Sequence, residues 1–201
     1  MSRYTGPNNK KARRLKFSIL ENNKEFIKGK KRTTSPGQHG ARRQKLSNYG
    51  EHLYEKQKLR FMYGLSEKQL RNTFIKATKV AGVLGTNLLI SLESRLDNIV
   101  FRTGIANTRR QARQFVNHGH ILVNGKKVDI PSYVVKVGDE VSVKERTKDN
   151  FFMQDNITKS KPVEFVTFDT KTMTGKFERL PERSELTGQI NEALVVEYYN
   201  K

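Results

Sequence analysis

The chain has 201 residues, of which 35% are hydrophobic, and its 39 Lys and Arg against 20 Asp and Glu give a net charge of +19. This excess predicts a polyanionic partner, with an anionic membrane surface as the alternative. No apolar run approaches the ~18 residues of a membrane span, no secretory signal is expected, and the absence of cysteine excludes disulfides and thiolate metal sites.

The positive charge is concentrated towards the N-terminus. Residues 1–49 hold 14 Lys or Arg and 2 Asp or Glu, whereas residues 150–201 hold 7 and 8. Residues 1–45 have too few apolar side chains for an independent core, so we expect loops with a short helix, ordered chiefly by a partner. A basic arm on a milder body is typical of nucleic-acid-binding proteins, and a merely solubilising tail is the alternative.

Three helices are predicted between residues 47 and 93, because apolar residues recur at helical spacing between capping signals. The expected caps are Ser47 or Asn48, the capping-box pair Ser66 and Gln69, and Thr86 or Asn87. The expected ends of the first two helices are Gly64 and Gly82. The expected core faces of the second and third helices are Leu70, Phe74, Ala77 and Ala81, then Leu88, Leu89 and Leu92.

Residues 94–145 predict two further helices and a small antiparallel sheet. The expected caps and ends of the helices are Ser94 with Asp97, Gly104, Thr108 with Gln111, and Gly119. On the second of these helices, Ala112, Phe115 and Val116 fall on one face at about 100° per residue. The opposite face carries Arg109, Arg110, Arg113, Gln114 and Asn117.

The sheet of this stretch is predicted from its turns. Asn124-Gly125 between two strand-like runs indicates a type I′ hairpin, and Gly138-Asp139 indicates a second turn. We expect Arg109, Arg110, Arg113, Lys126 and Lys127 on one surface, beside helix N–H groups that suit a phosphate. An ordinary solvated charged face is the alternative.

The C-terminal part of the chain predicts weaker elements. A helix is expected at about residues 151–157, and a hairpin formed by 163–168 and 176–180 extends the sheet. Residues 195–199 fit either a helix or a short strand.

No set of side chains suggests catalysis. There is no nucleophile–base–orienter combination and no Gly-rich phosphate loop, so we expect neither an enzyme nor a cofactor nor a small-molecule substrate. His118 and His120 could suggest a metal pair, but His39 and His52 lie far away in the sequence, and no metal is expected. Imidazoles beside an arginine-rich helix suit RNA bases or phosphates instead.

Several segments resemble a known family. Residues 109–113, 117–121 and 123–126 look like the αL RNA-binding module of the fourth small-subunit ribosomal protein family, which some pseudouridine synthases and heat-shock RNA-binding proteins share. Residues 36–40, 55–60, 180–186 and 191–199 extend the resemblance along the chain, in the bacterial, cysteine-free form. Some members hold zinc on four arm cysteines, which this chain lacks.

The resemblance implies an α+β fold in which an αL-type module, with helices packed on a small antiparallel sheet, is inserted into a helical domain. The implied ranges are a basic arm at 1–45, a discontinuous helical domain at 46–92 and 181–201, and the module at 93–180. The tail at 181–201 would pack on the first helical domain.

The resemblance also implies a function and partners. The protein would be a structural constituent of the small ribosomal subunit, ribosome-bound in the cytoplasm, and a primary ribosomal-RNA-binding protein. It would clamp a multi-helix RNA junction, nucleate assembly of the subunit body and contribute to translational accuracy. Its implied partners are small-subunit ribosomal RNA and neighbouring ribosomal proteins, notably the fifth of the small subunit, and no membrane.

The candidate RNA-binding residues are cations, imidazoles, aromatic rings and helix-start polar groups. They are Arg3, Lys10, Lys11, Arg13, Arg14, Lys16, Lys30, Lys31, Arg32, His39, Arg42, Arg43, Lys45, Tyr49, Lys58, Arg60, Tyr63, Arg71, Thr108, Arg109, Arg110, Arg113, Asn117, His118, His120, Lys126 and Lys127. Removing the side chains of Arg109 and Arg113 together is predicted to weaken RNA binding and leave the fold intact.

Two other functions belong to different classes. An RNA-modifying enzyme with the same module, such as a pseudouridine synthase, needs a catalytic domain for which the residues after 150 are too few. A DNA-binding regulator would place the second helix of the 94–145 stretch in a major groove.

Overall fold

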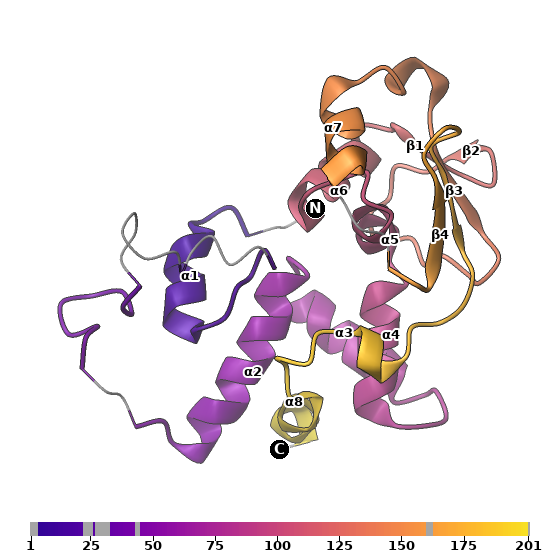
Figure 1. Ribbon diagram of the computed structural model, residues 1–201. Coiled ribbons are helices and arrows are strands. Elements are labelled where there is room, and N and C mark those ends of the chain that lie inside the picture. Colours follow the sequence, from indigo (N-terminus) through magenta and orange to yellow (C-terminus); the bar gives the residue numbers. More distant parts are fainter. Residues whose placement is uncertain (1–3, 22–25, 27–32, 43–44, 160–162, 201) are drawn as a thin grey trace. The chain divides into compact units, whose positions relative to one another are not determined.

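The computed structural model describes residues 4–21, 26, 33–42, 45–159 and 163–200, and Figure 1 shows its helices and strands. The chain forms two compact units, Met1–Thr86 with Thr187–Lys201, and Asn87–Leu186. The α+β class expected from the sequence is confirmed, with a five-stranded antiparallel sheet and helices. The domain ranges expected from the resemblance, including a separate arm at 1–45, differ from these two units and stay a prediction.

The first unit is helical. Its complete helices are α1 (Asn8–Leu15), α2 (Asn48–Met62), α3 (Glu67–Ala77) and α8 (Glu192–Asn200). The first three residues of α4 (Leu84–Glu93) also belong to it. The predicted cap of α2 is confirmed, since the Ser47 hydroxyl accepts a hydrogen bond from the Gly50 N–H at 3.2 Å. At α3, Ser66 and Gln69 form the predicted capping box with bonds of 3.3 and 2.9 Å.

Two predicted boundaries in this unit are wrong. Helix α3 ends at Ala77, so Gly82 does not end it and Ala81 is exposed beyond it. The Thr78 hydroxyl donates to the Ile75 carbonyl at 2.8 Å and helps to satisfy the last turn. Helix α4 begins at Leu84, so Thr86 and Asn87 lie inside it rather than at its cap.

The core of the first unit joins distant parts of the sequence, since α8 packs against α2. Residues 195–199 are therefore helical rather than extended, with Val195 fully buried. The described part of the arm also contributes, because Leu15, Phe17 and Ile19 are only 3–6% exposed. This part has a packed face within the unit, which the expectation of an arm ordered chiefly by its partner did not include.

The second unit is built on the sheet. Its strands are β1 (Ile121–Val123), β2 (Lys126–Lys127), β3 (Glu140–Val143), β4 (Val166–Asp169) and β5 (Thr174–Phe177), in the order β2-β1-β3-β5-β4 with every pair antiparallel. Figure 1 shows α5 (Leu96–Arg102), α6 (Arg109–Asn117) and α7 (Phe151–Lys159) gathered on one side of it. Short 3₁₀ turns lie at Glu145–Thr147 and Arg183–Glu185.

The turns of the sheet are those that the sequence predicts. Asn124 and Gly125 have φ of +49° and +74°, the two positive values that a type I′ hairpin requires. The second hairpin, β4–β5, extends the sheet beyond β3 as expected. Helices α5 and α6 and the sheet share one apolar core. It contains Leu96, Ile99, Val100, Ala112, Val116, Ile121, Val123, Val141, Val143, Phe165 and Phe177.

The predicted capping box at the start of α5 is wrong. The first helical residue is Leu96, and the Ser94 hydroxyl donates to the Ile90 carbonyl at 2.8 Å instead of accepting from α5. Asp97 receives arginine side chains rather than reaching back to a backbone N–H. The backbone N–H groups of Leu96 and Asp97 donate to the carbonyls of Tyr133 and Pro131. The loop before β3 therefore caps α5 from outside, which local spacing does not reveal.

Candidate nucleic-acid interface

Helix α6 is the centre of the candidate interface, and local contacts set its start. The Thr108 hydroxyl accepts from the Gln111 N–H at 3.2 Å, as predicted for the cap. The Gln111 side chain accepts from the Asn107 N–H at 2.9 Å, one residue before the cap itself. Ala112 and Val116 are fully buried, so the side of α6 that carries them faces the core and the opposite side faces away from it.

The solvent face of α6 continues onto the β1–β2 hairpin. Arg110 is exposed in the first turn of the helix, Asn117 and His118 are exposed at its C-terminal end, and both β2 lysines are exposed. The hairpin meets the helix at Gly119, because a Cβ added there would lie 2.3 Å from Cε of Lys127. Gly119 has φ of +70°, the left-handed conformation that ends α6. The two elements thus form one cationic surface, here called the α6–β2 surface: Arg110, Asn117, His118, Lys126 and Lys127.

Behind this surface lie two buried carboxylates. Asp97, whose side chain is 5% exposed, receives Nη2 of Arg113 at 2.6 Å and Nη2 of Arg95 at 2.8 Å. Nε of Arg113 donates to the same carboxylate at 3.0 Å. One acid on α5 therefore neutralises an arginine of α6 and a second arginine just before α5.

The second carboxylate is Glu93 at the end of α4, whose side chain is 1% exposed. It accepts from Nη2 and Nε of Arg102 at 2.8 and 3.0 Å, and Nη2 of Arg109 lies 3.7 Å away. Nε of Arg109 donates to the Asn98 amide oxygen at 2.6 Å, and the guanidinium lies 4.6 Å from the centre of the Phe101 ring. Together Glu93, Asp97 and Asn98 form the buried acid network that holds α6.

The structure corrects the expected position of two arginines. The side chains of Arg109 and Arg113 are 10% and 12% exposed and lie in this network, not on a solvated face. The prediction that removing both would leave the fold intact loses its premise, because Asp97 would keep only Arg95 and the Asn98 amide oxygen would lose its bond from Arg109. A helical wheel places them opposite Ala112, but it cannot show that α4 and α5 cover that side.

The two histidines at the end of α6 have different surroundings. His118 is exposed, whereas His120 is half-buried and its Nδ1 lies 3.2 Å from the Thr147 hydroxyl. Burial lowers the pKa of His120, and the charges of His118 and Lys144 act in the same direction. Among the described residues no group of three or more His, Cys, Asp or Glu could hold a metal ion.

The candidate residues of α2 are mostly engaged within the first unit. Nζ of Lys58 pairs with Glu55 at 2.5 Å, and Nη1 of Arg60 donates to the Gln57 side chain at 3.2 Å. Tyr49 is 57% exposed, so its ring is accessible to a base. Tyr63 is 4% exposed, so its ring is covered within the first unit and is not accessible for base stacking in this structure. Its assignment to the RNA-binding residues stays a prediction.

Apart from Tyr63, which is buried, the sequence-predicted candidates fall into three groups. Those exposed are Lys10, Arg14, Lys16, His39, Arg42, Lys45, Tyr49, Arg71, Arg110, Asn117, His118, Lys126 and Lys127. Those of intermediate exposure are Lys11, Arg13, Lys58, Arg60, Thr108, Arg109, Arg113 and His120, and among them the side chains of Arg109 and Arg113 are mostly buried. Arg3, Lys30, Lys31, Arg32 and Arg43 lie outside the described residues.

Sequence reasoning missed the acids of the network. Glu93 and Asp97 lie four residues apart in a run that is otherwise rich in leucine, isoleucine and valine. A carboxylate inside such a run is rarely buried unless it is paired, and that signal could have directed attention to nearby arginines.

Family models match two adjacent parts of the chain. Residues 3–93 match the model described as the ribosomal protein S4/S9 N-terminal domain, and residues 94–141 match that of the S4 domain. No helix in the described part of the chain has the length and apolar character to cross a membrane.

Curated relatives match over the full length. The chain is 62% identical over 205 residues to small ribosomal subunit protein uS4 of Mesoplasma florum, covering 100% of this chain and 99% of that relative. It is 58% identical over 204 residues to the protein of the same name from Mycoplasma capricolum, covering 100% and 98%. The uS4 protein of Streptococcus thermophilus is 58% identical over 205 residues, covering 100% and 99%.

Proposed function

Because the chain belongs to the family of small ribosomal subunit protein uS4, we propose that it is a primary binder of small-subunit ribosomal RNA. The family is one of ribosomal structural proteins, so the chain is a structural constituent of the small subunit and ribosome-bound in the cytoplasm. This family is not known to be enzymatic, which agrees with the expectation that the chain is not an enzyme.

The α6–β2 surface is the observation that carries this proposal. Arg110, Lys126 and Lys127 hold exposed positive charge on two elements whose relative position is set by a common core. Phosphates are bound by such cations with release of condensed counterions, and this supplies affinity without reading sequence. Selectivity then comes from the spacing of the cations, which a folded RNA matches through its shape.

The buried acid network gives this surface its rigidity. Asp97 and Glu93 hold the two arginines that flank Arg110 on α6, at 2.6 and 3.7 Å, and so fix which side of the helix faces solvent. Arg109 and Arg113 are positioning residues in this proposal, and their contact with RNA is restricted to the small exposed part of each side chain. The exposed cations of the arm, Lys10, Arg14, Lys16, Arg42 and Lys45, add a second contact region.

Family membership also supports finer functions, which form part of the same proposal. A protein that grips several RNA helices at once would clamp a multi-helix junction and nucleate assembly of the subunit body. Contact with neighbouring ribosomal proteins, notably the fifth of the small subunit, and a contribution to translational accuracy are proposed on the same basis.

Two experiments test the proposed function. The first incubates full-length protein with small-subunit ribosomal RNA and measures binding in competition with duplex DNA and with an unstructured polyanion. We expect a clear preference for the folded RNA, and equal binding to all three would contradict the proposal. The second is fractionation of cells on a sucrose gradient, in which the protein should remain with the small subunit after a high-salt wash.

A further inference from the structure

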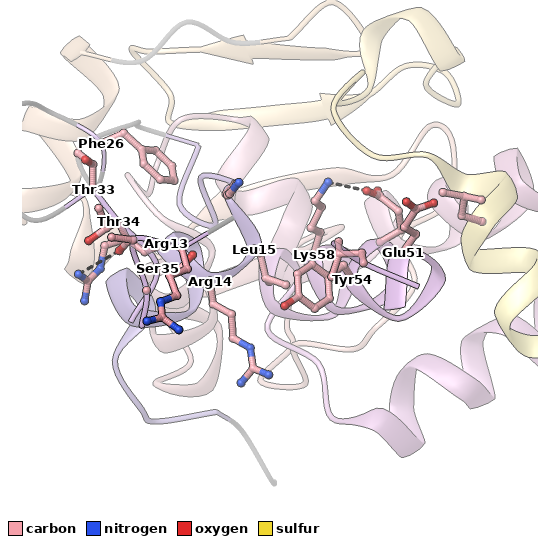
Figure 2. A pocket seen from close by; sticks show the side chains of 17 residues that line it. Arg13, Arg14, Leu15, Phe26, Thr33, Thr34, Ser35, Glu51, Tyr54 and Lys58 are labelled. Carbon is pink, nitrogen blue, oxygen red and sulfur yellow. Dashed lines mark hydrogen bonds and ion pairs between the residues drawn. The ribbon is translucent and has the colours of Figure 1, made fainter. Parts of the chain in front are cut away.

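The first unit contains a pocket of about 850 Å³ that the α6–β2 surface does not include. Its walls come from the end of α1, from the loop at residues 33–42 and from α2, as Figure 2 shows. Pockets of this size accommodate small organic ligands rather than single ions.

Besides Lys58, four cationic side chains line the pocket. Arg13, Arg14, Lys16 and Arg42 all line it, and within the described residues none of the four forms an ion pair. Nη1 of Arg13 donates to the Thr34 carbonyl at 3.4 Å, and Figure 2 shows these two residues at one end of the pocket with Ser35. Each of the three arginines is a candidate phosphate ligand, since guanidinium groups bind phosphate through paired N–H donors.

Another part of the wall is apolar and aromatic. Tyr54 lines the pocket together with Leu15, and Figure 2 shows both near Lys58 and away from Arg13. Glu51, Tyr54 and Lys58 lie three and four residues apart on α2, so they share one side of the helix. Lys58 is neutralised by Glu55 at 2.5 Å, whereas Glu51 is exposed at the rim and forms no ion pair among the described residues.

Backbone geometry shapes the wall between these ends. The loop folds back at Gly40, whose N–H donates to the Gly37 carbonyl at 3.2 Å. A Cβ added at Gly40 would lie 1.8 Å from the carbonyl oxygen of Ser35, an approach that backbone atoms cannot relieve locally. Only glycine permits this approach, so the loop that carries Thr34, Ser35 and Arg42 has a defined path past the pocket.

We infer that this pocket binds one unpaired nucleotide of the RNA. The phosphate lies among Arg13, Arg14 and Arg42, and the base lies against Tyr54 with its amino edge towards Glu51. Aromatic side chains stack on bases of any sequence, and a carboxylate accepts hydrogen bonds from the exocyclic amino groups that adenine, cytosine and guanine carry and uracil lacks. The inference rests on the proposed RNA binding and adds a site at which a single base is read.

A phosphate alone does not account for the whole lining. An anion site needs donors, and this pocket also has an aromatic ring and a carboxylate, which a free phosphate would not use. A nucleotide has one group for each part of the lining: an anion, a flat ring and amino donors. A free nucleoside 5′-monophosphate and a nucleotide within RNA both carry these groups. The experiment must therefore distinguish the two.

The first arm uses the complex of the full chain with small-subunit ribosomal RNA. Base-specific chemical probing should show an unpaired nucleotide that is protected by the wild-type protein and reactive with Tyr54→Ala. The dissociation constant should rise roughly 10- to 100-fold for Tyr54→Ala, and Tyr54→Phe should restore the protection because it keeps the ring. Unchanged protection and affinity in Tyr54→Ala would overturn the inference.

A second set of variants tests the pocket even if Tyr54→Ala fails to fold. Arg14→Ala removes an exposed charge of the pocket and should lower the slope of log K against log salt by about 1. Lys76→Ala, which removes an exposed charge of α3 outside the pocket, is the matched control for affinity and for the protected nucleotide. Gly40→Ala should lose the protection, whereas Gly188→Ala, with open space around its Cβ, should keep it.

The second arm uses free ligands with the full chain in equilibrium dialysis. Cytidine 5′-monophosphate should bind at least about 10-fold more tightly than either cytidine or inorganic phosphate. Uridine 5′-monophosphate should bind the wild-type protein more weakly than cytidine 5′-monophosphate does. In Glu51→Ala the two nucleotides should bind equally. Inorganic phosphate binding as tightly as the nucleotide would overturn the inference. If the wild-type protein failed to bind the RNA, the proposed function would fall, and this arm would still decide on the pocket by itself.

Discussion

Asp97 shows how a single acidic residue supports a basic surface. It lies within 3 Å of guanidinium nitrogens of both Arg95 and Arg113, and its side chain is 5% exposed. A buried carboxylate that loses a partner retains the cost of its desolvation, and so do the arginines if the acid is lost. We therefore expect the residues of the network to affect RNA binding through the fold and exposed arginines to affect it directly.

Arg110 and Arg113 provide a matched pair for this distinction. Arg113→Ala should lower the free energy of unfolding by about 1.5–3 kcal/mol, because it removes charge-assisted hydrogen bonds to Asp97. Arg110→Ala should change stability by less than about 0.5 kcal/mol, as at other exposed sites. It should weaken RNA binding and lower the salt slope by about 1.

Urea denaturation and RNA titrations at several salt concentrations measure the two effects. Asp97→Asn is the informative control, since it makes the protein more positive but loosens the helix. It should weaken RNA binding, and stronger binding would mean that net charge outweighs the position of α6.

His120 should make stability depend on pH. Its pKa is lowered in the folded protein, first by burial and then by His118 and Lys144, so the unfolded chain binds this proton more readily. The contribution to stability is present above the ordinary histidine range, near 6.5, and is lost as pH falls through the folded pKa. Thermal melts between pH 7.5 and 5 should show a smaller loss of stability in His120→Gln than in wild type, and parallel curves would contradict this assignment.

At the scale of elements, Glu67 joins three helices of the first unit. Its Oε1 accepts from Nζ of Lys56 on α2 at 2.8 Å and from the Tyr199 hydroxyl on α8 at 2.9 Å. Nζ of Lys56 also lies 4.2 Å from the centre of the Tyr198 ring. Burial raises the pKa of Glu67, but the hydrogen bonds from Lys56 and Tyr199 and nearby positive charges outweigh it, and the net pKa is lowered.

Glu67→Ala should therefore loosen α8. Lys56 is 3% exposed and would keep its charge without this acceptor, so we expect a loss of about 1–3 kcal/mol in the free energy of unfolding. The lowered pKa means that this contribution exists above the ordinary carboxyl range and is lost as pH falls through the folded value. Urea denaturation at pH 7 and pH 3 should show the difference from wild type shrinking at the lower pH.

A variant with the same charge change shows whether removing any carboxylate lowers the free energy of unfolding. Glu178→Ala removes a half-exposed carboxylate in the other unit, whose ion pair with Lys176 spans 3.6 Å. It should cost no more than about 1 kcal/mol, as is usual for surface pairs. A loss in Glu67→Ala no larger than in this control would contradict a role in holding α8.

At the scale of the whole molecule, the net charge of +19 predicts that RNA binding weakens as salt rises. With roughly 6–10 phosphate contacts, the affinity for ribosomal RNA should fall about 10³- to 10⁵-fold between about 50 and 200 mM salt. Filter binding or fluorescence anisotropy across this range measures the slope. A flat titration would show that counterion release is not the source of affinity.

Local signals were sufficient for much of this protein. The Asn124-Gly125 turn requires two positive φ values, the Ser66 box satisfies helix-start N–H groups, and Ala112 and Val116 mark the buried side of α6 by their spacing. Each of these depends on residues within about one turn of each other, so the sequence alone determined the elements, the sheet hairpins and the basic character of the surface. The resemblance to the ribosomal family likewise depended on short local motifs.

Only the tertiary structure decided which charges are available to a partner. Arg110 and Arg113 lie on the same helix and look alike in sequence, yet Arg113 faces the carboxylate of Asp97 and Arg110 faces solvent. Likewise, the pocket brings Arg14 together with Tyr54, forty residues later in the chain. The physical reason is that burial and pairing of a charge depend on which distant segments the core brings against it, and local spacing carries no information about those segments.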